Sequence, residues 1–335
     1  MTGQPLLRVR DLAVHFASET ARVARAVDGV SFELHAGETL ALVGESGCGK
    51  SLTALSLVRL VDEPPARTTT GSSIQLHGEE LVGAEPARLR RIRGGEVGFV
   101  FQEPMTSLNP VHRVGRQIEE AILAHDSVPR ATATARTLDL LSRVGLPEPD
   151  TAARAYPHEL SGGMRQRALI AMAISCGPSV LVADEPTTAL DVTVQAQILD
   201  LLASLRDETG MALLLISHDL AVVANVADRV AVMYGGRIVE TGPARRVLTT
   251  PAHPYTEGLL RAVPTIDDPR GPLAVIPGRV PSPTDWPSGC RFHPRCPYAW
   301  DRCAGEEPPL DGGLRCWLAS EPDRRGSTGY ALVTR

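Results

Sequence analysis

A glycine-rich loop at residues 44–51 constrains the fold of this chain more than any other feature. Its sequence, GESGCGKS, fits the pattern G-x-x-x-x-G-K-[ST]. The apolar run 39–43 predicts a strand before the loop, and residues 51–60 predict a helix after it. Strand, glycine loop and helix in this order predict a phosphate-binding loop, because glycines let backbone N–H groups converge on phosphate oxygens at a helix N-terminus.

Two side chains of this loop carry chemistry of their own. We expect Lys50 to reach the β- and γ-phosphates of ATP, and the Ser51 hydroxyl to ligate Mg²⁺. Cys48 occupies a variable position, so we expect its backbone rather than its thiol to face phosphate. The residues predicted to bind nucleotide here are Gly44, Glu45, Ser46, Gly47, Cys48, Gly49, Lys50, Ser51 and Leu52.

Two further motifs follow the loop along the chain. Residues 160–167 read LSGGMRQR, and residues 179–186 read SVLVADEP, an apolar run that ends in two carboxylates. The three motifs, in this order and at these distances, resemble those of the ATP-binding cassette (ABC) ATPases. The resemblance covers residue 7 to about residue 250. It implies that one subunit offers its phosphate loop, and that a second subunit completes the ATP site with its Leu-Ser-Gly-Gly signature.

The resemblance assigns roles to several side chains around the phosphates. Asp184 is similar to the aspartate that holds Mg²⁺ through water, with Ser51 and Gln102 as the other Mg²⁺ contacts. Glu185 is similar to the glutamate that polarises the attacking water, because phosphoryl transfer needs this water in line with the leaving oxygen. His218, which follows an apolar run, is similar to the histidine that contacts the γ-phosphate.

Other matched residues concern the adenine and the subunit interface. The resemblance implies that Asp191 crosses the interface between two ATPase subunits and that Phe16 stacks on adenine. A core position in a strand is the alternative for Phe16. The signature residues predicted to contact ATP from the opposite subunit are Ser161, Gly162, Gly163 and Met164. A hydroxyl and N–H groups that open a helix suit a γ-phosphate.

The pattern of apolar runs predicts an α/β fold. Strands are expected at residues 6–16, 30–34, 39–43, 97–101, 180–183, 212–216, 230–234 and 237–241, with a hairpin tip at 17–26. Residues 114–175 are expected to be helical, with a break at 147–157. The resemblance implies a P-loop fold with a RecA-like core, an antiparallel β subdomain and a helical signature subdomain. We expect this nucleotide-binding domain to span residues 1–250 and a proline- and cysteine-rich extension to span residues 251–335.

Composition limits where the chain works. No apolar run approaches the roughly 20 residues that span a bilayer, and the N-terminus lacks a secretory signal pattern. The net charge of -5 argues against nucleic acid as a partner, and the arginine-rich run 88–93 is typical of a solvated helix face. We therefore expect a cytosolic chain that reaches a membrane only through separate membrane-spanning partners.

Longer phrases narrow the resemblance to one branch. FQEPMTSLNP at 101–110, TTALDVTVQAQIL at 187–199, HPYT at 253–256 and GCRFHPRCPYAWDRC at 289–303 resemble the oligopeptide/dipeptide branch of bacterial ABC importers. That branch implies ATP hydrolysis beside a second, non-identical ATPase subunit, two transmembrane permease subunits and an extracytoplasmic substrate-binding protein. It places the chain on the cytoplasmic face of the inner membrane. Nickel chelates or other small solutes are alternative substrates.

A different class of protein is the main alternative. Soluble ABC ATPases act in DNA repair and translation, but they usually carry coiled-coil insertions, tandem cassettes or basic arms. The sequence has none of these features.

The extension holds four clustered cysteines, Cys290, Cys296, Cys303 and Cys316, and more than half of the chain's 27 prolines. In a reducing compartment clustered cysteines indicate metal rather than disulfides. The tight pairs usual for zinc are absent, and four thiolates suit a [4Fe–4S] cluster. The resemblance implies that cluster, while zinc, unbound thiols and a redox-sensing module stay open as alternatives. His293 is expected to lie beside the site. We expect a structural role, because nothing in the sequence places these cysteines near the phosphate loop.

Overall fold

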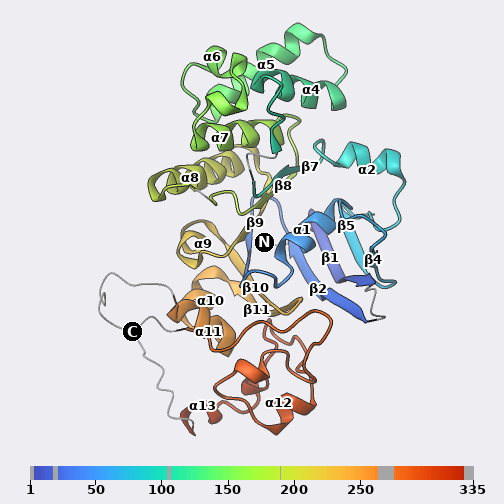
Figure 1. Cartoon of the computed structure of the whole chain (residues 1–335), viewed down its shortest axis with the longest axis vertical. Coiled ribbons are helices and arrows are strands. Elements are labelled where there is room, and N and C mark those ends of the chain that lie inside the picture. The colour runs from blue at the N-terminus through green and yellow to red at the C-terminus, as the bar shows by residue number, and fades with distance from the viewer. Residues whose placement is uncertain (1–3, 18–21, 104–106, 189, 263–274, 328–335) are drawn as a thin grey trace.

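The computed structural model describes residues 4–17, 22–103, 107–188, 190–262 and 275–327. Two sheets lie in the middle of the molecule, a helical subdomain covers one end and the extension covers the other (Figure 1). Three clusters of buried apolar side chains hold these parts together. The P-loop ABC ATPase fold predicted from the sequence is confirmed.

The central six-stranded sheet positions the phosphate loop. Its order is β11 (Arg237–Pro243), β10 (Arg229–Tyr234), β3 (Thr39–Val43), β9 (Ala212–Ser217), β8 (Val180–Asp184) and β7 (Val97–Val100). The strands from β10 to β7 are parallel, whereas β10 and β11 form an antiparallel hairpin. Every residue of β3, β8 and β9 is buried, as expected for parallel strands with both faces covered. Helices α1 (Lys50–Leu57), α8 (Val192–Thr209) and α9 (Leu220–Val226) follow β3, β8 and β9.

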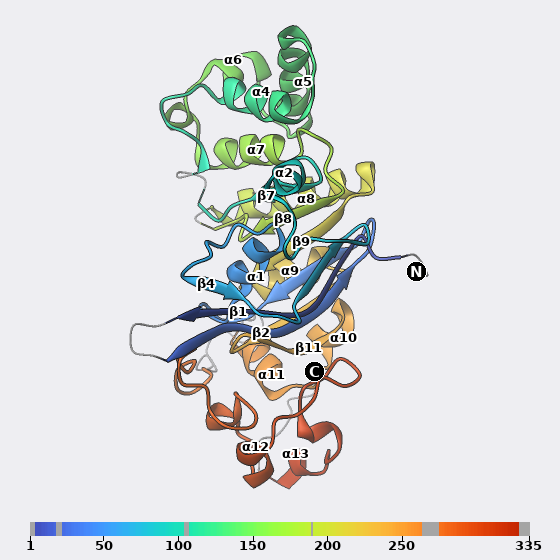
Figure 2. The same cartoon turned by 90° about the vertical axis from the view of Figure 1, so that its right-hand side faces the viewer.

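A second sheet is antiparallel and packs beside α1. It consists of β2 (Val23–Leu34), β1 (Leu7–Ala17), β5 (Ser73–Leu76) and β6 (Glu79–Glu80), with β4 (Ala66–Thr68) also paired to β1. Figure 2 shows β1 and β2 as long curved strands between the helical subdomain and the extension. Helix α2 (Pro86–Ile92) includes most of the arginine-rich run, and its Arg88 forms ion pairs with Glu79 and Glu96. The solvated face predicted for this run is therefore partly engaged in ion pairs.

The helical subdomain comprises α4 (Val114–His125), α5 (Arg130–Arg143), α6 (Pro149–Arg154), the short η1 (Pro157–Glu159) and α7 (Gly162–Ala173). Its apolar faces meet β8 and α8 in one buried cluster. The predicted break in the helical pattern at 147–157 is wrong in part, because α6 lies inside this range. A proline at the first helical position is compatible with a helix, since its missing N–H would be unpaired there anyway.

The ends of several elements also differ from the prediction. Strand β2 begins at Val23, so the paired strands extend into the predicted hairpin tip, of which residues 18–21 lie outside the described residues. Pairing of Ala17 with Val23 extends the ladder to that point. Helix α1 ends at Leu57 rather than residue 60, and β7 ends at Val100 rather than residue 101.

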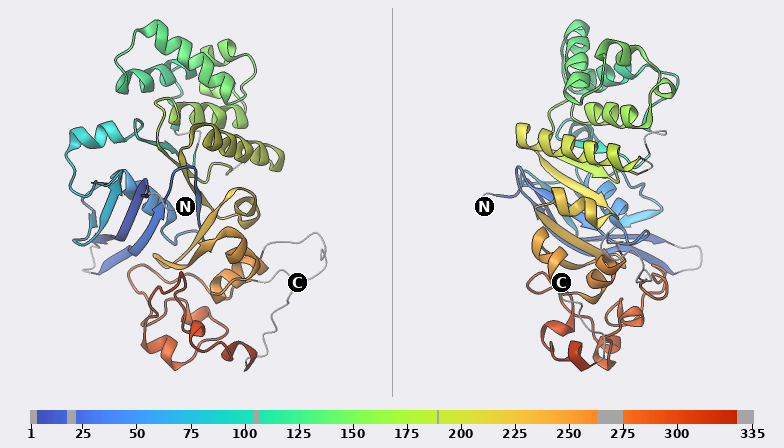
Figure 3. Two further views of the ribbon diagram at one scale, coloured as in Figure 1. Left: turned by 180° about the vertical axis from the view of Figure 1, so that it is seen from behind. Right: turned by 90° about the vertical axis from the view of Figure 1, so that its left-hand side faces the viewer.

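The extension follows α10 (Ala244–Thr249). Its regular elements are short: α11 (Pro254–Arg261), η2 (His293–Arg295), α12 (Asp301–Gly305), η3 (Trp317–Ala319) and α13 (Arg324–Ser327). Both views of Figure 3 place this segment against the β10–β11 side of the sheet. Tyr255 and Phe292 pack with Tyr234 of β10 in one buried cluster, with ring centroids 4.6–5.4 Å apart. The extension thus shares a core with the ATPase instead of forming a separate one.

Candidate functional site

The phosphate loop connects β3 to α1 in a conformation that needs glycine at two positions. Gly44 has φ 152°, and a Cβ there would lie 2.2 Å from the Met233 carbonyl oxygen. Gly49 has φ 105°, and a Cβ there would lie 2.7 Å from the Ala26 carbonyl oxygen. Because both neighbours are backbone atoms, any larger residue would displace the loop.

Lys50 lies inside this loop and is almost fully buried. Its Nζ donates hydrogen bonds to the carbonyl oxygens of Gly44 (2.8 Å) and Glu45 (3.1 Å). The Cys48 thiol is fully buried 3.9 Å from Nζ, and burial raises its pKa. Ser46 and Gly47 are exposed at the tip of the loop. This burial agrees with the expectation that Cys48 presents its backbone rather than its thiol.

Ser51 and Asp184 bring two oxygen ligands together across the strand ends. The Ser51 hydroxyl donates to Asp184 Oδ1 at 3.1 Å. Burial raises the pKa of Asp184, the neighbouring Glu185 charge adds to this, and the Ser51 hydrogen bond opposes it. Hydroxyl and carboxylate oxygens are hard ligands of the kind Mg²⁺ prefers, so the pair fits that ion.

Three other side chains lie around the carboxylate of Glu185. Its Oε2 accepts hydrogen bonds from Gln102 Nε2 (3.0 Å) and Thr188 Oγ1 (3.0 Å) and lies 3.3 Å from His218 Nδ1. The Glu185 backbone has φ 46°, in the left-handed region where side chains other than glycine are uncommon. Gln102, Glu185 and His218, which were predicted at strand ends, are therefore next to one another. Thr188 was not identified from the sequence, although its position three residues after Glu185 in a turn was a usable signal.

The signature opens α7. The Ser161 hydroxyl accepts a hydrogen bond from the Met164 N–H (3.3 Å), and Gly162 and Gly163 form the first helical residues. Asp191 caps α8 in the same way, because its Oδ1 accepts from the Val194 N–H at 3.0 Å. These caps give both helix starts a defined orientation. Contact of either with an opposite subunit stays a prediction.

Phe16 and Leu52 flank the loop. Phe16 lies near the end of β1, paired with Ala24 and Ala66, and packs partly buried against the first apolar cluster. Leu52, in α1, packs against the same cluster. Adenine stacking by Phe16 stays a prediction.

The four cysteines of the extension line one cavity. Cys290, Cys296, Cys303 and Cys316 line one small cavity together with His253, His293 and Trp317. All four are free thiols. Burial raises the pKa of each thiol, to about 12 for Cys296 and Cys316. Within residues 4–327 as described, no three His, Cys, Asp or Glu side chains are grouped closely enough to hold a single metal ion.

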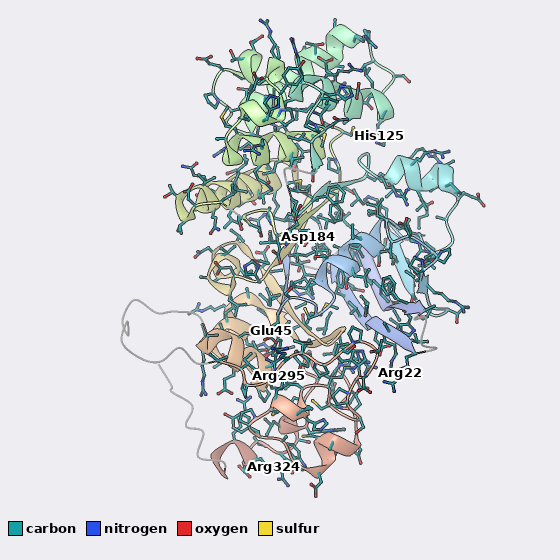
Figure 4. The ribbon with its side chains drawn as sticks, viewed as in Figure 1. Arg22, Glu45, His125, Asp184, Arg295 and Arg324 are labelled. Atoms are coloured by element: carbon teal, nitrogen blue, oxygen red, sulfur yellow. The ribbon has the colours of Figure 1, made fainter. Side chains whose placement is uncertain are left out.

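The extension also touches the phosphate loop. Arg295 pairs with Glu45 through two hydrogen bonds, Nη1 to Oε2 at 2.7 Å and Nη2 to Oε1 at 3.0 Å. The Tyr255 hydroxyl accepts a hydrogen bond from the Glu45 N–H at 2.8 Å. Figure 4 shows Arg295 and Glu45 side by side, with Asp184 farther along the sheet. Arg295 immediately precedes Cys296, so the segment that carries this cysteine contacts the phosphate loop, a proximity that nothing in the sequence indicated.

The fold and these side chains define an ABC ATPase. The family model described as ABC transporter matches residues 27–188, and the model described as oligopeptide/dipeptide transporter, C-terminal region, matches residues 239–303. The dipeptide transport ATP-binding protein DppD of Escherichia coli (strain K12) is 49% identical over 306 residues, which are 91% of this chain and 93% of that protein. The chain therefore belongs to the ABC transporter ATP-binding proteins of the oligopeptide/dipeptide family.

Solved structures agree with this assignment. The dimeric structure of MJ0796, a bacterial ABC transporter cassette, is similar with a TM-score of 0.63 and 25% identity, over 71% of this chain and 99% of that one. A post-hydrolysis state of the same cassette, bound to ADP and Pi, has a TM-score of 0.64, with the same identity and coverage. Among the helices of the described residues, none combines the length and the apolar character needed to cross a membrane.

Proposed function

We propose that this chain hydrolyses ATP to drive import of dipeptides or oligopeptides. The observation that carries this proposal is the match of residues 239–303 to the C-terminal region of oligopeptide/dipeptide transporters. The similarity to a dipeptide transport ATP-binding protein over 91% of the chain supports it. We place the boundary between the nucleotide-binding domain and the extension after residue 250, between α10 and α11.

The proposed assembly has five components. This chain and a second, non-identical ATPase subunit lie under two transmembrane permease subunits, and an extracytoplasmic binding protein delivers the solute. The chain is peripheral, at the cytoplasmic face of the inner membrane. Ser161, Gly162 and Gly163 of this chain complete the ATP site of the second subunit, whose own signature completes the ATP site of this chain, with Asp191 at the interface. An N-cap hydroxyl and free N–H groups at a helix start suit a γ-phosphate.

In the ATP site, nucleotide binding depends on the phosphate loop and on two strand ends. Lys50 exchanges one of its carbonyl partners for phosphate oxygens, which lets its ammonium neutralise charge on the β- and γ-phosphates. Ser51 and Asp184 would hold Mg²⁺, with Gln102 as a further contact. The ion, when bound, would neutralise charge that develops on the phosphates. Phe16 supplies a flat face for adenine.

Glu185 orients the attacking water and accepts its proton. Gln102 and Thr188 hold one carboxylate oxygen in place at 3.0 Å each, which leaves Oε1 for the water. His218, an exposed side chain whose Nδ1 lies 3.3 Å from Oε2, is placed to reach a γ-phosphate. Thr188 is thus a positioning residue, since it acts through Glu185.

We further propose that the four cysteines bind one [4Fe–4S] cluster. Such a cluster takes one thiolate per iron, so its ligands surround a body of several atoms instead of one ion. Four cysteine thiols that line one shared cavity supply that number of ligands. The ATPase motifs do not depend on this assignment.

Peptide uptake tests the proposed function. The chain is co-expressed with the ATPase, permease and binding-protein genes next to its own, and labelled di- and oligopeptide uptake is measured in cells that lack other peptide importers. We expect uptake that is abolished by Lys50→Ala in this chain. Purification of this chain without permeases, together with no peptide uptake, would contradict the proposal.

A further inference from the structure

One short segment joins the cysteine cavity to the ATP site. Cys290 and Cys296 bound it, and both line the cavity. Between them, Arg291 and Arg295 reach the ATPase. Arg291 donates to the Gly235 carbonyl oxygen in the β10–β11 turn and pairs with Asp28 of β2. We call residues 290–296 the strut.

The strut meets the phosphate loop at Glu45. The Arg295 side chain is only 4% exposed, and its guanidinium holds both carboxylate oxygens of Glu45. Its Nε donates to the Pro277 carbonyl oxygen at 2.8 Å, which fixes the guanidinium plane. A buried arginine held in this fork geometry orients its carboxylate as well as neutralising it.

Glu45 is also held at its backbone, on both sides. Its N–H donates to the hydroxyl of Tyr255, which belongs to the HPYT motif of the extension. Its carbonyl oxygen accepts from Lys50 Nζ. Glu45 is therefore bound by the extension and is also the residue whose carbonyl oxygen accepts a hydrogen bond from the Lys50 ammonium.

A second path from the strut reaches the same loop. Arg291 anchors the carbonyl of Gly235, and the next N–H, from Gly236, donates to the Cys48 carbonyl oxygen at 3.0 Å. The strut thus supports the loop at its second residue and, through the β10–β11 turn, at its fifth.

Arg295 affects nucleotide binding through its positive charge. ATP brings several negative charges to a loop that already contains the Glu45 carboxylate. Without Arg295 this carboxylate, which is 31% exposed, would lose its ion-pair partner in the loop proposed to bind the phosphates, and like charges at short range repel. With Arg295 the pair is neutral and the backbone of Glu45 stays in place.

We propose that Arg295 and Tyr255 of the extension are positioning residues of the phosphate loop, and that they set nucleotide affinity by holding Glu45. The proposal rests on the proposed ATP site, but it does not depend on the transported solute or on what the cysteines bind. Arg295 contributes through Glu45 rather than through contact with ATP.

Binding of mant-ATP with Mg²⁺ to the full-length chain tests this proposal. Arg295→Ala should raise the dissociation constant about tenfold, a typical size for coupling between two sites. Adding Glu45→Gln to Arg295→Ala should restore affinity to within about threefold of the wild type, because the unpaired carboxylate is then removed. Arg295→Lys should be intermediate, since it keeps the charge and loses the fork.

Arg302→Ala is the matched control. Arg302 also lies in the extension and pairs with Glu306 and Glu321, so its loss should leave mant-ATP affinity unchanged. Two results would overturn the proposal while wild-type ATP binding stands: affinity of Arg295→Ala within twofold of the wild type, or no recovery in the double variant. If Arg295→Ala does not fold, Arg295→Lys and its pair with Glu45→Gln decide the question. No loss in Arg295→Lys, or no recovery with Glu45→Gln, then counts against it.

Discussion

The ATP site and the cysteine cavity both gather side chains from distant segments, but by different means. At the ATP site, Lys50, Gln102, Asp184 and His218 follow buried strands of one sheet. Parallel strands end at the same edge, so the sheet itself brings these residues together. Around the cavity the cysteines lie in or beside elements of three to five residues, and packing against β10 and β11 places them.

Because of this difference, we expect substitutions in the two regions to have different effects. The strand ends are fixed by a sheet whose strands β3, β8 and β9 are buried along their whole length, so we expect a change at the ATP site to alter chemistry and leave folding intact. The cavity is built from irregular chain, which has little regular hydrogen bonding to hold it. There we expect a change to alter local folding first and ATP turnover second.

The largest effect is expected at Glu185. Glu185→Gln removes the group that accepts the proton of the attacking water, and it should slow phosphate release by at least about 100-fold. ATP binding should persist, because Lys50, Ser51 and Asp184 are unchanged. Steady-state phosphate release and mant-ATP binding in the assembled complex measure the two properties separately.

Lys50→Ala provides the contrast, since it should lose nucleotide binding before any chemistry. Near-normal turnover in Glu185→Gln would remove Glu185 from its assigned role. Unfolding of either variant would contradict the view that the sheet fixes this site independently of its polar side chains.

The cysteine cavity should respond in the opposite way. Serine at Cys316 should reduce iron and acid-labile sulfide in anaerobically purified protein and expose the extension to protease, because metal ligation supplies folding energy. Cys176→Ser is the matched control, because this half-buried thiol donates to the Ala121 carbonyl in the helical subdomain. Stoichiometric zinc without iron would contradict the cluster.

A smaller effect should appear at Tyr255, where the two regions meet. Tyr255→Phe leaves the Glu45 N–H without its acceptor, and we expect mant-ATP affinity to fall about two- to fivefold. Tyr298→Phe is the control, since its hydroxyl donates to Glu257 within the extension. Equal affinities in the two variants would show that the Tyr255 hydroxyl does not support the loop.

The same difference explains what the sequence could predict. The sequence predicted the glycine loop, the carboxylate pair, the glutamine and the histidine, because each of them follows an apolar strand in a local pattern. Thr188, Tyr255 and Arg295 were missed, because their partners lie in turns or far away in the chain. The Arg295–Glu45 pair spans 250 positions, and no period or spacing encodes a contact of that kind. The helix α6 was missed because the prolines of residues 147–157 were interpreted only as breakers, although Pro149 begins the helix.

We propose that the ATP site of this chain is complete only with the signature of another ATPase subunit. Phosphate release by the purified chain at low concentration is to be compared with release by the complex that contains the second ATPase and the permeases. We predict turnover in the complex on the order of 100-fold above that of the chain alone, as expected when transition-state contacts are supplied from a partner. Equal turnover per chain in both preparations, independent of concentration, would contradict it.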